Sequence, residues 1–166
     1  MLTFVGKLFP RFAALAPKFE VENVEPPLSS AEIAHLQQQL GLELPPSYKA
    51  LLACSGGFCL MGGVIRFVEP FIHEFKPFDL LTSAQKAMVR WKGGTWPPPS
   101  DGMLCFAEFW MEADGDQVLF DVSQGLINDE YPVIYYAHEG RPPSVRLLAT
   151  TFIEFMEAFL EYPAFR

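Results

Sequence analysis

The side chains best suited to chemistry in this sequence are three cysteines and one of the histidines: Cys54, Cys59, Cys105 and His138. Structural zinc sites have closely spaced ligand pairs, whereas Cys54 and Cys59 have four residues between them and no second pair follows. Cys54 also falls on the apolar face of a predicted helix, where a thiol packs as a small hydrophobe. We therefore predict no metal site. A cysteine–histidine nucleophile pair stays open, because its members need only meet in space.

The sequence lacks the motifs of two other common chemistries. There is no Gly-x-Ser-x-Gly elbow of a serine hydrolase, and no glycine-rich phosphate loop precedes a lysine. The glycine pairs at 56–57 and 62–63 are typical of turns instead. A small hydrolase is consequently the least supported function.

Acidic side chains surround a tryptophan between residues 108 and 116. The run 112–116 resembles part of a calcium loop, but no glutamate completes the ligand spacing, so a hairpin turn bearing acids is the better interpretation. Specific interfaces combine aromatic anchors with complementary charge. We predict that partner binding involves an acidic patch made of Glu108, Trp110, Glu112, Asp114 and Asp116. Solvated surface decoration is the alternative, since exposed acids usually contribute little energy.

The charge balance favours a basic partner. The formal net charge is −8, which argues against nucleic-acid binding, because nucleic-acid binders normally present a basic face. Residues 1–18 contain three basic residues and no acid, so all 20 acids lie in residues 19–166 against nine basic residues. An acidic body of this kind associates faster with a basic partner.

Length and composition indicate one soluble domain. A chain of 166 residues can bury a sizeable core, and no apolar run approaches the roughly 18 residues of a membrane-spanning helix. Three cysteines are an odd number and favour a reducing cytosol over a disulfide framework. We therefore expect a cytoplasmic protein that does not bind membranes.

The start of the sequence is apolar and basic. Lys7, Pro10 and Arg11 interrupt the apolar centre that a secretory signal needs, and an organellar transit peptide stays open although serine is scarce. We expect residues 1–26 to form an extension that packs onto a domain at 27–166. The apolar side chains expected to make this contact are Phe4, Leu8, Phe9 and Phe12.

Four segments have the signals of helices: residues 29–41, 45–57, 82–91 and 151–162. The first and last open with a serine or threonine followed three residues later by a glutamate, which is the spacing of a capping box. The second opens at two prolines and is predicted to close at Gly56-Gly57, because glycine adopts a left-handed cap without a Cβ penalty. The first, second and last each present one apolar stripe to a core.

Strands are predicted at residues 63–68, 71–78, 103–109, 116–122 and 131–138. The third and fourth flank a turn-rich segment, so they are expected to form a hairpin. The order of elements predicts an α+β fold with two amino-terminal helices, an antiparallel sheet of five or six strands, and a carboxy-terminal helix packed on the sheet.

Several motifs in this order resemble the SUKH superfamily of Smi/Knr-type domains over residues 27–161. They are Leu44-Pro45-x-x-Tyr48-x-x-x-Leu52 followed by a glycine pair, Gly115-Asp116, Phe120-Asp121, Pro132-Val133 followed by His138, and the closing Thr151-Phe152-x-x-Phe155. Ser55 stands where such domains usually have asparagine, and serine can also bond its own backbone in a turn.

The resemblance implies a non-enzymatic binding protein that needs no cofactor. Many bacterial SUKH proteins look like immunity proteins, which bind and neutralise a cognate toxin, often a nuclease, delivered between competing cells. The expected function is therefore that of an immunity protein that occludes a basic toxin. Eukaryotic relatives imply the alternative of a regulatory or scaffolding module without a toxin partner, and the absence of long disordered flanks favours the immunity protein.

Overall fold

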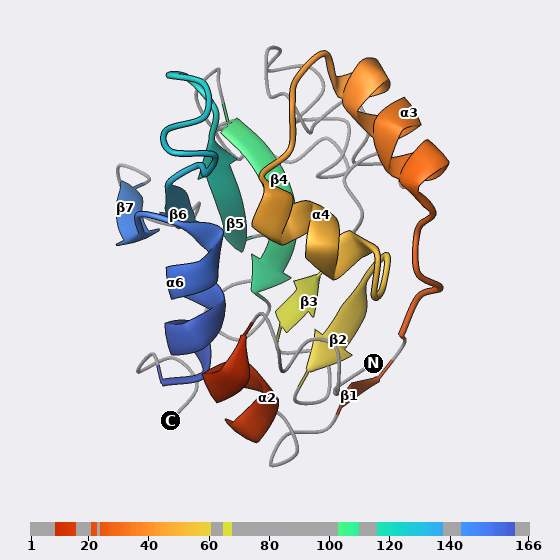
Figure 1. Ribbon diagram of the computed structural model, residues 1–166. Helices are drawn as coiled ribbons and strands as arrows, with labels where there is room; N and C mark the ends of the chain where they lie inside the picture. Colours follow the sequence, from red (N-terminus) through yellow and green to blue (C-terminus); the bar gives the residue numbers. More distant parts are fainter. Residues whose placement is uncertain are drawn as a thin grey trace, which may run out of the picture.

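The computed structural model describes residues 9–15, 21–22, 24–60, 65–67, 103–109, 116–137 and 144–161. In these ranges the chain forms one antiparallel sheet, and the helices α2, α4 and α6 lie in front of it in Figure 1. The helices are α2 (Pro10–Leu15), α3 (Ser30–Leu40), α4 (Pro46–Leu52), α6 (Phe152–Ala158) and the 3-10 helix η2 (Phe159–Glu161). The strands are β1 (Val21–Glu22), β2 (Phe58–Leu60), β3 (Ile65–Phe67), β4 (Met103–Phe109), β5 (Asp116–Asp121), β6 (Val133–Ala137) and β7 (Ser144–Ala149). The predicted α+β class is confirmed.

Each strand pairs with the next strand along the chain, so the seven described strands follow the order β1 to β7 across the sheet. The sequence predicts only five or six strands. It misses β1 and β2, because strands of two and three residues are too short to show an alternating pattern. The pattern also misses β7, whose first described side chains are exposed. β4 and β5 form the predicted hairpin. The strand predicted at 71–78 and the helix predicted at 82–91 lie outside the described residues.

The predicted capping box is complete at the start of α3, whereas at α6 only the bond from Glu154 to the Thr151 side chain forms as predicted. Ser29 Oγ accepts a hydrogen bond from the Glu32 N–H at 3.3 Å, and Glu32 Oε2 accepts one from the Ser29 N–H at 2.7 Å. At α6, Thr151 Oγ1 accepts from the Glu154 N–H at 3.0 Å, while the Glu154 carboxylate accepts from the N–H of Thr150 at 2.9 Å. These bonds satisfy amide groups that otherwise have no partner within the helix.

The two capping glutamates predict a stability loss in acid. Hydrogen bonds from the Ser29 side chain and backbone lower the pKa of Glu32 below its ordinary value of 4.5, and those from Thr150 lower the pKa of Glu154 likewise. A lowered folded-state pKa stabilises the fold above pH 4.5, and this contribution disappears as the pH falls through the folded-state pKa. A Glu32→Gln/Glu154→Gln variant keeps the hydrogen-bonding shape but cannot titrate.

We therefore expect urea unfolding of this double variant to depend less on pH below 4.5 than unfolding of the wild type. Gln38→Ala, at an exposed position of α3, is the control and should keep the wild-type pH dependence. Identical acid dependence in wild type and double variant would contradict the prediction.

The predicted glycine cap of α4 is wrong. The helix ends at Leu52, and neither Gly56 nor Gly57 has a positive φ angle. Gly56 instead permits a close approach of two chain segments. Its N–H donates to the Pro26 carbonyl oxygen at 2.9 Å, and a Cβ atom there would lie 3.1 Å from both that oxygen and Leu28 Cδ1.

Aromatic side chains fill the space between the sheet and the helices. Tyr48 of α4 is 1% exposed, and its ring centroid lies 5.1 to 5.7 Å from those of Phe106, Phe120 and Phe152. A β-bulge at Phe106 lets this residue and the following Ala107 both enter the core, although neighbouring strand residues normally point to opposite faces. The helices are therefore held to the sheet by an aromatic cluster.

The amino-terminal helix α2 contributes directly to this core. Phe9 and Phe12 are 0% and 2% exposed. The Phe9 ring meets Phe152 edge-on at a centroid distance of 5.7 Å, and Phe12 stacks on Phe159 at 5.5 Å. Phe4 and Leu8, which the sequence also predicts to pack here, lie outside the described residues.

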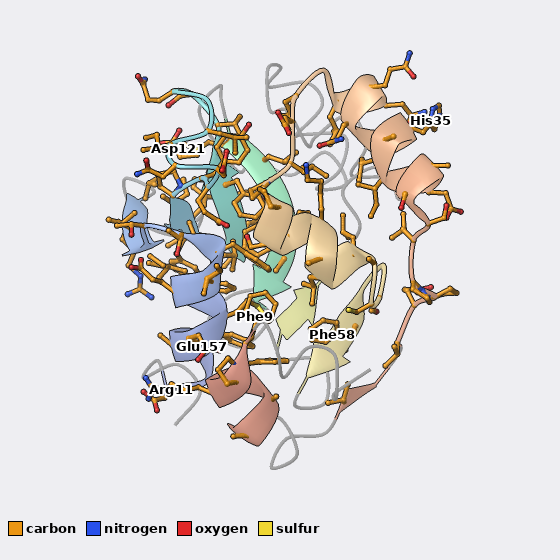
Figure 2. The ribbon with its side chains drawn as sticks, in the orientation of Figure 1. Phe9, Arg11, His35, Phe58, Asp121 and Glu157 are labelled. Carbon is orange, nitrogen blue, oxygen red and sulfur yellow. The ribbon has the colours of Figure 1, made fainter. Side chains whose placement is uncertain are left out.

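A polar contact accompanies this packing where α2 meets α6 (Figure 2). The Glu157 carboxylate of α6 accepts from the backbone N–H of Arg11 at 3.0 and 3.2 Å, and the Arg11 guanidinium pairs with Glu161. The carboxylate thus satisfies a backbone donor in the first turn of α2. The division into an extension at 1–26 and a domain at 27–166 stays a prediction.

Candidate functional site

Strand pairing places the two ends of the predicted acidic patch at one end of the sheet. Leu60, Ile65, Phe109 and Asp116 form a row across β2 to β5, because each residue is paired with the next. The residues that flank the segment 110–115, Phe109 and Asp116, therefore lie at the same end of the sheet. This arrangement matches the predicted hairpin.

The structure describes two of the five residues of the acidic patch. Glu108 belongs to β4, although its side chain is not among those described. Asp116 begins β5, is 3% exposed, and accepts a hydrogen bond from the Tyr135 hydroxyl. Its carboxylate is therefore engaged inside the domain. The other three residues lie outside the described residues, and the patch stays a prediction for Glu108, Trp110, Glu112 and Asp114.

Asp116 belongs to a group of buried polar side chains on β4, β5 and β6. Burial, together with the negative charge of Asp116, raises the pKa of Tyr136 to about 12. Gln117 is fully buried and donates from Nε2 to the Cys105 Sγ atom at 3.2 Å. The unbroken burial of β5 from Asp116 to Phe120 is the sign of a strand covered on both faces.

The described thiols are packed against other groups of the domain. All three cysteines are free, and Cys59 and Cys105 are buried. Cys54 donates to the Ala50 carbonyl oxygen at 3.1 Å, and burial raises its pKa, which lowers the fraction of reactive thiolate. Within the described ranges no group of three or more His, Cys, Asp or Glu side chains could hold a metal ion, and His138 lies outside those ranges.

A tight turn lies toward the other end of β5, in the connection to β6 (Figure 1). Ile127 and Glu130 exchange backbone hydrogen bonds of 2.8 and 3.1 Å around Asn128 and Asp129, whose φ angles are 52° and 63°. The Glu130 carboxylate accepts from the Phe152 N–H at 3.0 Å, so the turn is attached to the start of α6. Sequence reasoning misses this turn, although an Asn-Asp pair is a weak form of the Asn-Gly hairpin signal.

The described surface is acidic. Eight acidic side chains are described that are not buried, against the three basic side chains of Arg11, Lys49 and Arg146. Arg11 and Lys49 are each paired with a glutamate. The sequence of residues 93–140 contains nine acids and neither lysine nor arginine, which places much of the negative charge on the segment that includes β4, β5 and β6.

These features define an α+β domain with an aromatic core and an acidic exterior. Residues 27–158 match the model of the SMI1 / KNR4 family (SUKH-1), so the chain belongs to this family. The family resemblance seen in the motifs is thereby confirmed. The family includes immunity proteins of polymorphic toxin systems, and its domains are generally non-catalytic.

A comparison with curated proteins gave no match. Within the described ranges, no helix is both long and apolar enough to cross a membrane.

Proposed function

We propose that this protein is an immunity protein that binds a cognate antibacterial toxin one to one and neutralises it by covering its active site. Membership of the SUKH-1 family over residues 27–158 carries the proposal. The protein acts in the cytoplasm, where a toxin delivered by a competing cell would do its damage. Three free cysteines suit that reducing compartment.

The acidic surface supports a nuclease as the toxin. Nucleases hold phosphate groups with basic side chains, so a surface rich in carboxylates can occupy the same positions. Opposite charge also accelerates diffusional encounter, which matters for a protein that must find its target before the target acts. The net charge of −8 suits such a partner.

The proposal is tested by co-expressing the tagged protein with the product of the adjacent gene. A one-to-one complex in which the toxin has lost its activity supports an immunity function. Failure of the purified proteins to associate, or association without loss of toxin activity, would overturn it. Forming the complex at two salt concentrations shows whether charge steers the association.

Within that complex, the acidic patch is the proposed contact, with Trp110 as its aromatic anchor. Glu112→Lys and Asp114→Lys should each lower the association rate constant about two- to tenfold at low salt, because charges at the rim of an interface act mainly on encounter. The effect should shrink at high salt, where the Debye length falls to about 3 Å at 1 M. Stopped-flow mixing measures the association rate constant at low and at high salt.

Glu25→Lys makes the same charge change at an exposed site between β1 and α3, so it controls for net charge alone. Equal association rates for all three variants would show that the acidic patch has no special role. Such a result would leave the toxin complex itself intact.

A further inference from the structure

Two exposed segments, the turn before β6 and the start of α6, combine large apolar side chains with acids. Ile127 is 52% exposed in the turn before β6, and Ile153 is 42% exposed at the start of α6. Asp129 and Glu154 are exposed in the same two segments. We call these four residues the turn–helix face.

The two segments of this face are fixed to each other. Ile127 is tied to Glu130 by two backbone hydrogen bonds, and the side chain of Glu130, 8% exposed, accepts from the Phe152 N–H at 3.0 Å. Ile153 is the next residue of α6. The face is thus already ordered before any partner arrives, which lowers the entropy cost of binding.

The charge around the face selects the kind of partner. Residues 93–140 and 147–165, which include both segments, contain no lysine or arginine. Glu154 is held in its ionised form by hydrogen bonds from Thr150. A single exposed isoleucine is ordinary, but two on joined segments that also carry exposed acids have the mixed apolar and charged composition of an interface.

We infer that the turn–helix face is a second contact surface for a basic protein partner, which is the toxin under the proposed function on which this inference rests. The complementary surface of the partner would have an apolar side chain flanked by lysine or arginine. Asp116 and Asp121, the two ends of β5, are roughly 17 Å apart at about 3.3 Å per residue. A standard interface of about 800 Å² per partner is wide enough to include both ends.

The test measures binding of the purified product of the adjacent gene to an Ile127→Ser/Ile153→Ser variant. The dissociation constant should rise at least tenfold, mainly through faster dissociation, because apolar side chains at the centre of an interface control its lifetime. The matched control is Val24→Ser/Val145→Ser, which removes two apolar side chains that are each 50% exposed elsewhere on the surface. Equal thermal unfolding midpoints establish that both variants are folded.

A second variant tests the charge of the face without touching the isoleucines. Asp129→Asn keeps a residue that tolerates the left-handed turn conformation and removes one carboxylate. It should slow association two- to threefold at low salt.

Wild-type affinity of the isoleucine variant, with a tight wild-type complex, would overturn this inference and leave the proposed function standing. An equal loss of affinity in the valine control would also overturn it. No binding by the wild-type protein would overturn both the inference and the proposed function.

Discussion

Phe12→Ala should lower the free energy of unfolding by about 3–5 kcal/mol, the usual cost of removing a buried aromatic side chain from a core. Phe12 is 2% exposed, stacks on Phe159 at a centroid distance of 5.5 Å, and lies 6.3 Å from Phe58. Its loss leaves a cavity where α2, η2 and β2 meet. Urea unfolding followed by tryptophan fluorescence or circular dichroism measures the effect.

This prediction tests whether the stable folded unit extends beyond the family match, which begins at residue 27. If only residues 27–158 formed the stable unit, Phe12→Ala would behave as a surface change and stay within about 0.5 kcal/mol of the wild type. Val24→Ala removes an apolar side chain that is 50% exposed and serves as the matched control. A small effect of Phe12→Ala, equal to that of the control, would show that α2 contributes nothing to stability.

Glu130→Ala should lower the free energy of unfolding by about 2–3 kcal/mol. The Glu130 side chain is buried and accepts a hydrogen bond from the Phe152 N–H, a backbone group that is itself buried. Removing the carboxylate leaves that donor without its partner, and an unsatisfied buried donor costs about 1–3 kcal/mol, more where the lost bond was to a charged group. The same change detaches the turn at Ile127–Glu130 from α6.

Two further variants distinguish the effect of the lost hydrogen bond on stability from the effect of the lost side-chain volume. Glu130→Gln keeps an acceptor oxygen and should recover part of the lost stability, whereas Gln124→Ala, at an exposed site in the same connection, should change little. Hydrogen exchange of the Phe152 amide should accelerate in Glu130→Ala. Unchanged exchange at this amide would contradict the assigned hydrogen bond.

The local parts of the fold follow from the sequence, because the signals act between residues close in the chain. The capping box at Ser29 and Glu32 forms as predicted, and so does the hairpin of β4 and β5. The predicted glycine cap of α4 fails because Gly56 responds to a distant neighbour, the Pro26 carbonyl oxygen. A pattern read along the chain contains no information on such an approach.

The acidic patch also has features that the sequence predicts and features that depend on distant contacts. Composition and charge identify an acidic protein, and the family match supports a binding function. Sequence reasoning treats Asp116 as a surface acid, yet its side chain is buried and bonded to Tyr135. Local polarity could not show this, because the burial of Asp116 depends on the pairing of β5 with β4 and β6.

By itself the sequence determined the α+β class, the capped helices and the acidic character, since helix caps, hydrophobic periodicity and net charge are properties of short segments or of composition. Only the tertiary structure decided that Gly56 approaches the Pro26 carbonyl oxygen, that Asp116 is buried, and that Glu130 joins a turn to α6. Each of these depends on contacts between segments far apart in the chain. Such contacts form only when the whole core closes, because the packing of many side chains together sets which segments meet.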